Sequence, residues 1–582
     1  MRRRPNVRRK QVLVSTHDGP GKDAPGWWKS AVIYQVYPRS FADSNGDGLG
    51  DIGGVRARLG HLRDLGVDAI WMSPWYPSPM ADAGYDVADF RDIDPVFGTL
   101  AEAEALIEEA HAAGLRMIVD IVPNHVSSEH PWFRAALASP DAPERDYFWF
   151  RPGKGENMPT NWPGEFGGTT WTQVPDGDWY LHLFTPQQPD LNWNHPAVRA
   201  EFESILRFWF DRGVDGIRID SAALLFKDPA LPEMTDGAPH PFHDLDAVHD
   251  VYRSWRRVAD EYSATTTRDR ALIGEVWMPD VNRFTNYLRP DELHAAFNFE
   301  FLGCAWDPAL MRACIDSTLE AHAAVGAPST WVLSNHDVTR HVTRYGRADT
   351  TFSFDNNLDR TPVDLELGTR RARAAALLSL SLPGSAYVYQ GEELGLWENE
   401  HIAEDRIQDP MYARRGHTRD GCRVPLPWAE DEPPFAFTAN APTLSDSALP
   451  EPALLEPALP EPTLPEPTLP EPTLPEPWLP QPREWKDRTV QAQTGDPNSM
   501  LELYRRAIRL RRAEPGLHTP EMTWLDHGPD VLAYTRGPDF ACVLNLSGAA
   551  VPLPDHVSPL LVSGPLDDGG LLPPDTAAWL RL

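Results

Sequence analysis

The stretch Gly216-Ile-Arg-Ile-Asp220 is a short apolar run that ends in an acidic residue. Three further segments combine an apolar run with carboxylates in a similar way: Asp120-Ile-Val-Pro-Asn-His125, Ile273-Gly-Glu275 and Ser334-Asn-His-Asp337. Each run is typical of a buried strand, and burying an unpaired carboxylate is costly, so the repetition indicates that the acids are used. Parallel strands that deliver acids to one rim are how a TIM barrel builds an active site. The chain is therefore predicted to be an enzyme.

Strand-like runs alternate along the chain with amphipathic helical stretches such as residues 100–113 and 198–210. The eight candidate strands are residues 31–37, 67–72, 115–122, 214–220, 271–276, 295–301, 330–333 and 386–389. Alternation of this kind favours a parallel sheet, and eight repeats favour a closed barrel. We expect an α/β fold, a (β/α)8 TIM barrel built from residues 27–125 and 188–428.

Other segments do not fit the barrel pattern. Residues 126–187 are rich in Pro, Gly, Trp and Asp and are too long for a βα loop, so they predict an inserted irregular subdomain after the third strand. Residues 429–485 form a proline-rich loop with Leu-Pro-Glu-Pro-Thr repeats, which cannot be helix or central strand. Residues 486–515 predict a helical region that closes the barrel, and residues 516–582 a C-terminal all-β domain.

Composition narrows the class of ligand and the compartment. The 582 residues carry 53 basic and 85 acidic side chains, a net charge of −32 that disfavours nucleic acid and acidic membranes and suits a small neutral substrate. No stretch approaches the roughly 20 apolar residues of a membrane span. Residues 1–26 predict a disordered basic tail, since no apolar segment follows the arginines. The 4 cysteines are scattered, as in reduced thiols, so we expect a cytoplasmic protein. The sequence leaves the oligomeric state open.

Two of the acids predict opposite roles. Arg218 and Asp220 share a face of their strand, and a guanidinium beside a carboxylate favours the ionised form, which suits a nucleophile. Glu275 lies among apolar residues, where desolvation favours the protonated form, which suits a general acid. Two carboxyls tuned in this way, about 5–5.5 Å apart, are what glycosidic cleavage through a covalent intermediate requires.

With these motifs in this order, the chain from about Trp27 to Trp428 resembles the α-amylase superfamily, glycoside hydrolase family 13, and within it the bacterial α-glucosidase and oligo-1,6-glucosidase branch. The resemblance implies that Asp220 is the nucleophile, Glu275 the acid/base, and Asp337 a third carboxylate that binds sugar hydroxyls. It also implies a set of substrate-binding residues. They are Tyr85 as a stacking platform, Asp86, His125, Arg218, Ser221, His336, and an arginine of the segment Arg419-Asp-Gly-Cys-Arg423, with Arg419 as the candidate.

Two further matches concern the branch. Gln188-Pro-Asp-Leu-Asn192 resembles a marker of the oligo-1,6-glucosidase-like group. In that group a valine after the nucleophile accompanies α-1,6 activity, whereas this chain has Ser221. The resemblance therefore implies an exo-acting α-glucosidase for α-1,4 bonds in maltose and short maltooligosaccharides, with sucrose as a further candidate.

A loop after the first strand has the chemistry of a calcium site. In Asp43-Ser-Asn-Gly-Asp-Gly-Leu-Gly-Asp51, oxygen ligands alternate with glycines, as at the start of an EF-hand but without its final glutamate. The resemblance implies a structural Ca²⁺ held by Asp43, Asn45, Asp47, the Leu49 carbonyl and Asp51, and no cofactor for catalysis. The alternative is an Asp- and Gly-rich turn that binds no metal.

Two other functions remain open. One is a trehalose synthase, a sucrose or maltose isomerase or a transglucosidase on the same scaffold, which would differ by excluding water. The other is a non-catalytic carbohydrate-binding relative, which the intact Asp220, Glu275 and Asp337 oppose.

Overall fold

The computed structural model describes residues 26–266, 268–354, 358–438, 475–554 and 557–582. The predicted basic tail lies almost entirely outside these residues, and so do the Leu-Pro-Glu-Pro-Thr repeats. None of the helices formed by the described residues is both long and apolar enough to cross a membrane.

Eight parallel strands form the central sheet, in the spatial order β10-β11-β1-β2-β3-β7-β8-β9. The strands are β1 (Val32–Val36), β2 (Ala69–Met72), β3 (Arg116–Ile121), β7 (Gly216–Ile219), β8 (Ala271–Gly274), β9 (Ala295–Ala296), β10 (Thr330–Val332) and β11 (Ser385–Tyr389). They are short and buried, as expected of strands covered on both faces. At the remaining seam the Thr330 hydroxyl donates to the Ala296 carbonyl at 2.6 Å. The predicted (β/α)8 barrel is confirmed.

Helices surround the sheet, and the predicted helical stretches 100–113 and 198–210 correspond to α3 and α5. The barrel helices are α1 (Ile52–Ala57), α2 (Leu59–Leu65), α3 (Leu100–Ala112), α5 (Pro196–Asp211), α6 (Val248–Thr265), α7 (Val281–Asn286), α8 (Phe299–Gly303), α9 (Pro308–Val325), α10 (His341–Tyr345), α11 (Leu365–Ser381) and α12 (Tyr412–Arg415). Helix α3 starts with a capping box in which Thr99 and Glu102 bond each other's backbone N–H.

One predicted strand is wrong in its second half. Residues 295–301 have an alternating aromatic pattern, but only Ala295–Ala296 pair with a neighbour. The Asn298 side chain then accepts a hydrogen bond from the Phe301 backbone N–H and begins the short helix α8. A cap residue inside the run therefore overrides its strand-like pattern.

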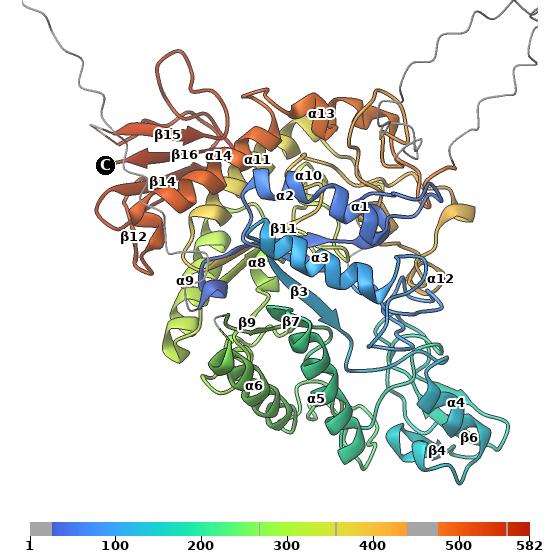
Figure 1. Ribbon diagram of the computed structural model, residues 1–582. Coiled ribbons are helices and arrows are strands. Elements are labelled where there is room, and N and C mark those ends of the chain that lie inside the picture. Colours follow the sequence, from blue (N-terminus) through green and yellow to red (C-terminus); the bar gives the residue numbers. More distant parts are fainter. Residues whose placement is uncertain (1–25, 267, 355–357, 439–474, 555–556) are drawn as a thin grey trace, which may run out of the picture.

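The residues after β3 form a separate small unit on one side of the barrel (Figure 1). It contains α4 (Pro131–Ala138) and a three-stranded antiparallel sheet of β4 (Phe150–Pro152), β5 (Trp171–Gln173) and β6 (Asp178–Leu181). Trp149, Trp162 and Trp171 lie in its core. Lys227 ties this unit to the barrel, because its Nζ contacts Asp190 Oδ2 at 2.6 Å and Asn124 Oδ1 at 2.7 Å.

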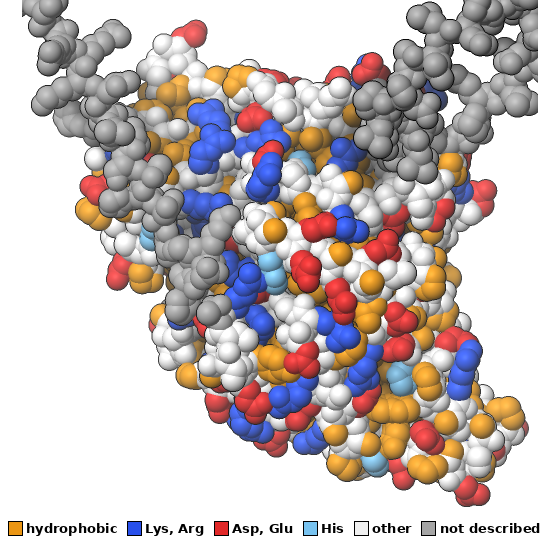
Figure 2. Space-filling view, in the orientation of Figure 1, with side chains coloured by type: hydrophobic (Ala, Val, Ile, Leu, Met, Phe, Trp, Pro, Cys, Tyr) orange, Lys and Arg blue, Asp and Glu red, His pale blue; other side chains and the backbone are white. Residues whose placement is uncertain are grey.

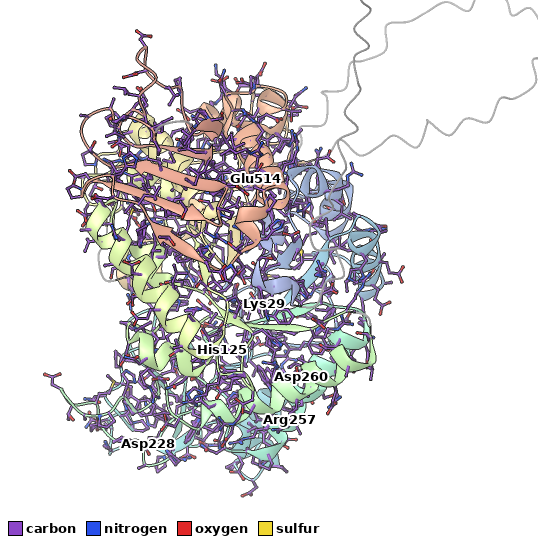
Figure 3. All side chains as sticks on the ribbon, turned by 90° about the vertical axis from the view of Figure 1, so that its left-hand side faces the viewer. Lys29, His125, Asp228, Arg257, Asp260 and Glu514 are labelled. Atoms are coloured by element: carbon purple, nitrogen blue, oxygen red, sulfur yellow. The ribbon has the colours of Figure 1, made fainter. Side chains whose placement is uncertain are left out.

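The C-terminal part is a five-stranded antiparallel sheet, which confirms the predicted all-β domain. Its strands are β12 (Met522–Trp524), β13 (Val531–Arg536), β14 (Phe540–Asn545), β15 (Ser558–Val562) and β16 (Thr576–Arg581), and α13 (Val490–Gln493) and α14 (Met500–Ala513) precede them. The Trp579 indole donates to the Leu377 carbonyl of α11 at 3.0 Å. Figure 3 shows Glu514, beside this sheet, at one end of the molecule and Asp228, on the loop after β7, at the other.

The surface seen in Figure 2 carries acidic and basic side chains interspersed with one another. One surface ion pair is Arg256–Asp260 on α6. Exposed pairs of this kind contribute little to stability, so the fold depends on its buried contacts.

Gly384 lies in the turn that leads into β11. Its φ is +113°, and a Cβ there would lie 2.1 Å from the Ser329 carbonyl oxygen. We expect Gly384→Ala to lower the free energy of unfolding by about 2–4 kcal/mol. The control is Gly60→Ala in α2, where a Cβ meets nothing within 4 Å; it should be neutral or stabilise by about 0.5–1 kcal/mol. Urea unfolding followed by circular dichroism measures both, and equal effects would contradict the prediction.

Candidate active site

The carboxyl ends of β3, β7 and β8 bring three acids around one guanidinium. Arg218 Nη1 donates to Asp120 Oδ1 and to Asp220 Oδ1, both at 2.9 Å. Arg218 Nη2 donates to Glu275 Oε2 at 2.6 Å. Asp220 and Glu275 are thus bound by the two terminal nitrogens of the same side chain, which places their carboxyl groups beside one another in the wall of one cavity.

The expected effect of Arg218 on Asp220 is not what the contacts show. Burial raises the pKa of Asp220 well above its ordinary value, and the charges of Glu275 and Asp120 add to burial while Arg218 opposes it. Burial likewise raises the pKa of Asp120 to about 7. Because Arg218 is shared by three carboxylates, it does not keep Asp220 alone ionised. That part of the prediction is wrong for the protein without substrate.

Glu275 is held by two further donors. Its Oε1 accepts from the Trp277 indole at 2.9 Å, and its Oε2 accepts from the Ser221 backbone N–H at 3.0 Å. Ser221 has φ +46°, a left-handed conformation that is uncommon for a residue other than glycine. The strained backbone after Asp220 thus aims an N–H at the second carboxyl, as strained residues at functional sites often do.

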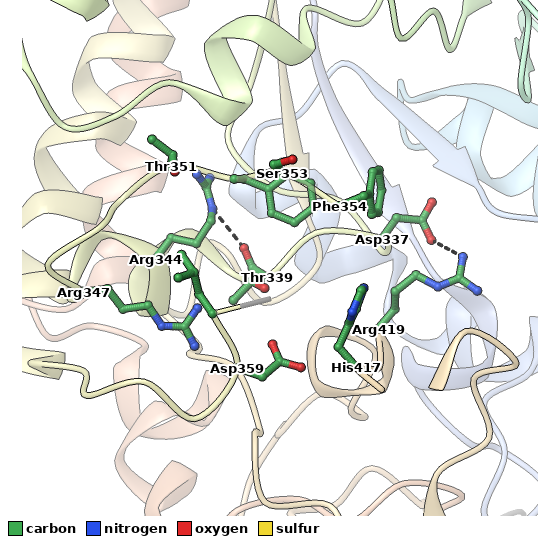
Figure 4. A pocket seen from close by; sticks show the side chains of 12 residues that line it. Asp337, Thr339, Arg344, Arg347, Thr351, Ser353, Phe354, Asp359, His417 and Arg419 are labelled. Carbon is green, nitrogen blue, oxygen red and sulfur yellow. Dashed lines mark hydrogen bonds and ion pairs between the residues drawn. The ribbon is translucent and has the colours of Figure 1, made fainter. Parts of the chain in front are cut away.

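A second group of charges surrounds Asp337. Its Oδ1 accepts from Arg419 Nη1 at 2.9 Å (Figure 4). It also accepts from Arg423 Nη2 at 2.7 Å. Burial would raise the pKa of Asp337, but His336, Arg419 and Arg423 together hold it below its ordinary value. Arg419 also donates to Asp82 Oδ1 at 2.9 Å. Asp337 is therefore a carboxylate fixed in its ionised form, ready to accept hydrogen bonds.

Two neutral histidines and a tyrosine complete this end of the site. Burial lowers the pKa of His125 and of His336 to about 3. Tyr85 stacks on His336 with 5.1 Å between ring centroids, and its hydroxyl donates to Asp120 at 3.1 Å. Gln35 Nε2 donates to His336 Nδ1, so the proton of this ring is on Nε2, 3.3 Å from Asp337 Oδ2.

The structure corrects the assignment of Asp86. Its carboxylate accepts from the backbone N–H of Ala81 and Asp82 and from the Ser78 hydroxyl, so it holds its own turn together. Asp82, four residues earlier, lines the cavity instead. Both acids lie in one turn, and a sequence motif does not tell which of them faces inward.

All these groups surround a cavity of about 310 Å³. The predicted residues in its wall are Tyr85, His125, Asp220, Ser221, Glu275, Asp337 and Arg419, whereas Arg218 and His336 lie behind them. Sequence reasoning missed the rest of the wall: Asp82, Glu165, Phe166, Phe184, Ala223, Leu224, His243, Trp277, Phe354, Met411 and Arg415. Most of these come from irregular segments, where no periodicity signals which side chains point inward.

The loop from Asp43 to Asp51 is held together by its own hydrogen bonds. Asp43 accepts from the backbone N–H of Asn45, Gly46 and Gly48. Asp51 caps α1 by accepting from Gly54 N, and it also accepts from the Ser44 hydroxyl. Within the described part of the chain, no group of three or more His, Cys, Asp or Glu residues is placed to hold a metal ion.

Comparison with known proteins adds to this geometry. Residues 35–448 match the family model "Alpha amylase, catalytic domain". The chain is 36% identical over 559 residues to a probable alpha-glucosidase of Rhizobium meliloti, covering 90% of each chain. It is also 36% identical over 452 residues to the trehalose-6-phosphate hydrolase of Escherichia coli, covering 72% of this chain and 78% of that protein.

Two solved structures resemble the whole molecule. The alpha-glucosyl transfer enzyme XgtA superposes with a TM-score of 0.78 at 31% identity, covering 95% of this chain and 99% of that one. The isomaltulose synthase SmuA of Protaminobacter rubrum superposes with a TM-score of 0.77 at 28% identity, covering 96% and 99%.

The two acids of the turn should behave differently when mutated. In Asp82→Ala, binding of an iminosugar mimic of glucose should weaken about 10- to 100-fold, because hydrogen bonds to a charged group are lost. In Asp86→Ala the melting temperature should fall, while binding per folded molecule falls less than in Asp82→Ala. Calorimetric titration and thermal melts measure the two effects, and the reverse pattern would restore Asp86 to the binding site.

Proposed function

The chain belongs to the α-amylase family and is a glycoside hydrolase, and from this premise we propose a retaining, exo-acting α-glucosidase. Its proposed substrates are maltose and short maltooligosaccharides, from which it releases terminal α-1,4-linked glucose, with sucrose as a further substrate. The observation that carries the proposal is the binding of Asp220 and Glu275 by the two nitrogens of one guanidinium in one cavity wall.

This geometry suits cleavage in two steps. In the first, an Asp220 oxygen bonds the anomeric carbon while Glu275 gives its proton to the departing glycosidic oxygen. In the second, Glu275 takes a proton from water, whose oxygen displaces Asp220 and restores the original anomeric configuration. Positive charge that develops on the sugar ring favours the ionised form of Asp220, against the effect of burial.

The closed end of the cavity supports exo action. Arg419 links Asp82 to Asp337, and Tyr85 lies beside them with 5% of its surface exposed. Gln188, from the segment that resembles the branch marker, donates to Asp82 Oδ2 at 3.0 Å. A wall of buried, mutually bonded polar groups leaves this end room for a terminal sugar and not for a continuing chain.

Ser221 supports the preference for α-1,4 bonds. It lines the cavity directly after Asp220 and has a positive φ. A β-branched valine at this position would be strained by that conformation and would fill space beside the bond to be cleaved. The small serine leaves that space for a sugar unit joined through O4.

Glucosyl transfer or isomerisation is the second candidate. The similarity to XgtA and to SmuA over nearly the whole chain favours it, because those proteins are named for transfer and synthesis. Chromatography of the products from maltose and sucrose separates the two functions. Free glucose supports hydrolysis, whereas trehalose, isomaltulose or longer oligosaccharides support the alternative.

The proposed setting is the cytoplasm, with a small neutral oligosaccharide as the only ligand needed for catalysis. The four cysteines are free thiols, as expected of a reducing compartment.

Replacing the nucleophile tests the mechanism. Asp220→Asn should lower kcat/KM for maltose about 10³-fold or more, because no covalent intermediate forms. Proton NMR of the wild-type reaction should show α-glucose as the first product. In Glu275→Gln, an activated glucosyl fluoride should leave a glucosyl group on the peptide that contains Asp220, detectable by mass spectrometry. Initial release of β-glucose, or label on another peptide, would refute the retaining mechanism.

Calcium in the loop from Asp43 to Asp51 stays a prediction from the resemblance, supported by its alternating oxygen donors. If Ca²⁺ binds there with micromolar affinity, removing it with a chelator should lower the melting temperature, and millimolar Ca²⁺ should restore it. Asp47→Ala should abolish the response. An unchanged melting temperature in chelator and in excess Ca²⁺ would leave the loop as a metal-free turn.

A further inference from the structure

We propose that Glu165 determines which sugars the cavity accepts beside the cleaved bond. In this proposal its carboxylate accepts hydrogen bonds from neutral sugar hydroxyls and rejects a leaving sugar that carries a phosphate. The inference rests on the proposed α-glucosidase function and names the substrate class of the same site.

Glu165 is held firmly at the cavity wall by its backbone. It lies between β4 and β5, in the unit inserted after β3. Its N–H donates to the Leu183 carbonyl at 2.7 Å, and its carbonyl accepts from Arg415 Nη2 at 2.7 Å. With the main chain anchored on both sides, the side chain has a defined position in the lining of the cavity.

The contacts of Arg415 place this wall next to the acid/base. Arg415 Nη1 donates to the Phe354 carbonyl at 3.2 Å. The Phe354 ring packs against the edge of Trp277 at 5.2 Å, and Trp277 donates to Glu275. The acid/base of a retaining glycosidase faces the leaving sugar. Glu165 and Arg415 therefore border the leaving-sugar side, opposite the closed end formed by Asp82 and Arg419.

The Glu165 carboxylate has no partner of its own. Among the residues that the structure describes, no hydrogen bond or ion pair reaches its oxygens, and burial raises the pKa of this carboxyl to about 7. By contrast, Arg419 is committed to three carboxylates, those of Asp82, Asp337 and Asp409. The Glu165 side chain is half-buried in the lining of the cavity, and hydroxyl groups of a bound sugar would supply donors to its carboxylate.

The charge of the cavity opposes an anionic ligand. Five acidic residues line it against two arginines, and both arginines already donate to protein groups. The two histidines of the wall have lowered pKa values because of burial and add no positive charge near neutral pH. A phosphate on the leaving sugar would approach the Glu165 carboxylate within the cavity, where like charges repel one another. Relatives of this chain include a protein named as a trehalose-6-phosphate hydrolase. Members of the family therefore differ in whether they accept a phosphorylated sugar.

Steady-state kinetics on a matched pair of substrates test the proposal. The pair is maltose and maltose with a phosphate on O6 of its reducing glucose. The variants are Glu165→Lys, Glu165→Gln and the control Glu156→Lys, which makes the same charge change at an exposed residue of the same inserted unit. Thermal melts verify that each variant is folded, and Glu165→Gln serves if Glu165→Lys does not fold.

For the wild type, kcat/KM for maltose should exceed that for the phosphorylated sugar by about 100-fold or more. Glu165→Lys should lower this ratio by about tenfold or more, and Glu165→Gln should lower it by a few-fold. A tenfold change in the ratio is about the size of one ordinary interaction between two charges. Glu156→Lys should keep the wild-type ratio.

Two results would overturn this inference and leave the proposed function standing. One is a wild type that cleaves both sugars equally well. The other is a ratio of kcat/KM values for the two sugars that is the same in both Glu165 variants as in Glu156→Lys. A wild type that hydrolyses neither maltose nor an aryl α-glucoside overturns the proposed function, and the inference with it.

Discussion

One buried guanidinium organises the chemistry of this protein. Arg218 is 1% exposed and forms ion pairs with carboxylates from three neighbouring strands. Removing so many charges from water is tolerable only when they are paired and fixed in place. The strand register provides this, because Arg218 is paired with Asp120 on one side and with Ile273 on the other. A one-residue slip of β7 would turn Arg218 away from the barrel interior and leave the acids without a counter-charge.

The barrel supplies the reacting groups, and the inserted unit supplies the shape of the site. Lys227 fastens the inserted unit to the barrel. Arg414 and Arg415 fasten it further through the carbonyls of Gly167, Phe184 and Glu165. These contacts involve main-chain atoms or buried partners, so the wall of the cavity is rigid. A rigid scaffold with a variable wall allows one chemistry to serve several substrates.

Much of this arrangement could be predicted from the sequence because buried parallel strands leave a strong pattern. Periodicity and the cost of burying charge are enough to predict the eight strands and the acids at their ends. Asp82 and Glu165 could not be found in this way, because they sit in turns and irregular segments whose side-chain directions depend on tertiary contacts. Residues 295–301 depart from the predicted strand for a local reason, because the cap at Asn298 outweighs an alternating pattern.

The backbone of Ser221 has a consequence for how such proteins can change. The amide that bonds Glu275 belongs to Ser221, whose side chain lines the cavity. Any substitution at Ser221 that alters the local torsion angles also moves the backbone N–H that bonds Glu275. A substitution at this position is therefore expected to change linkage preference and turnover together. Evolution toward a new disaccharide here would also have to restore turnover.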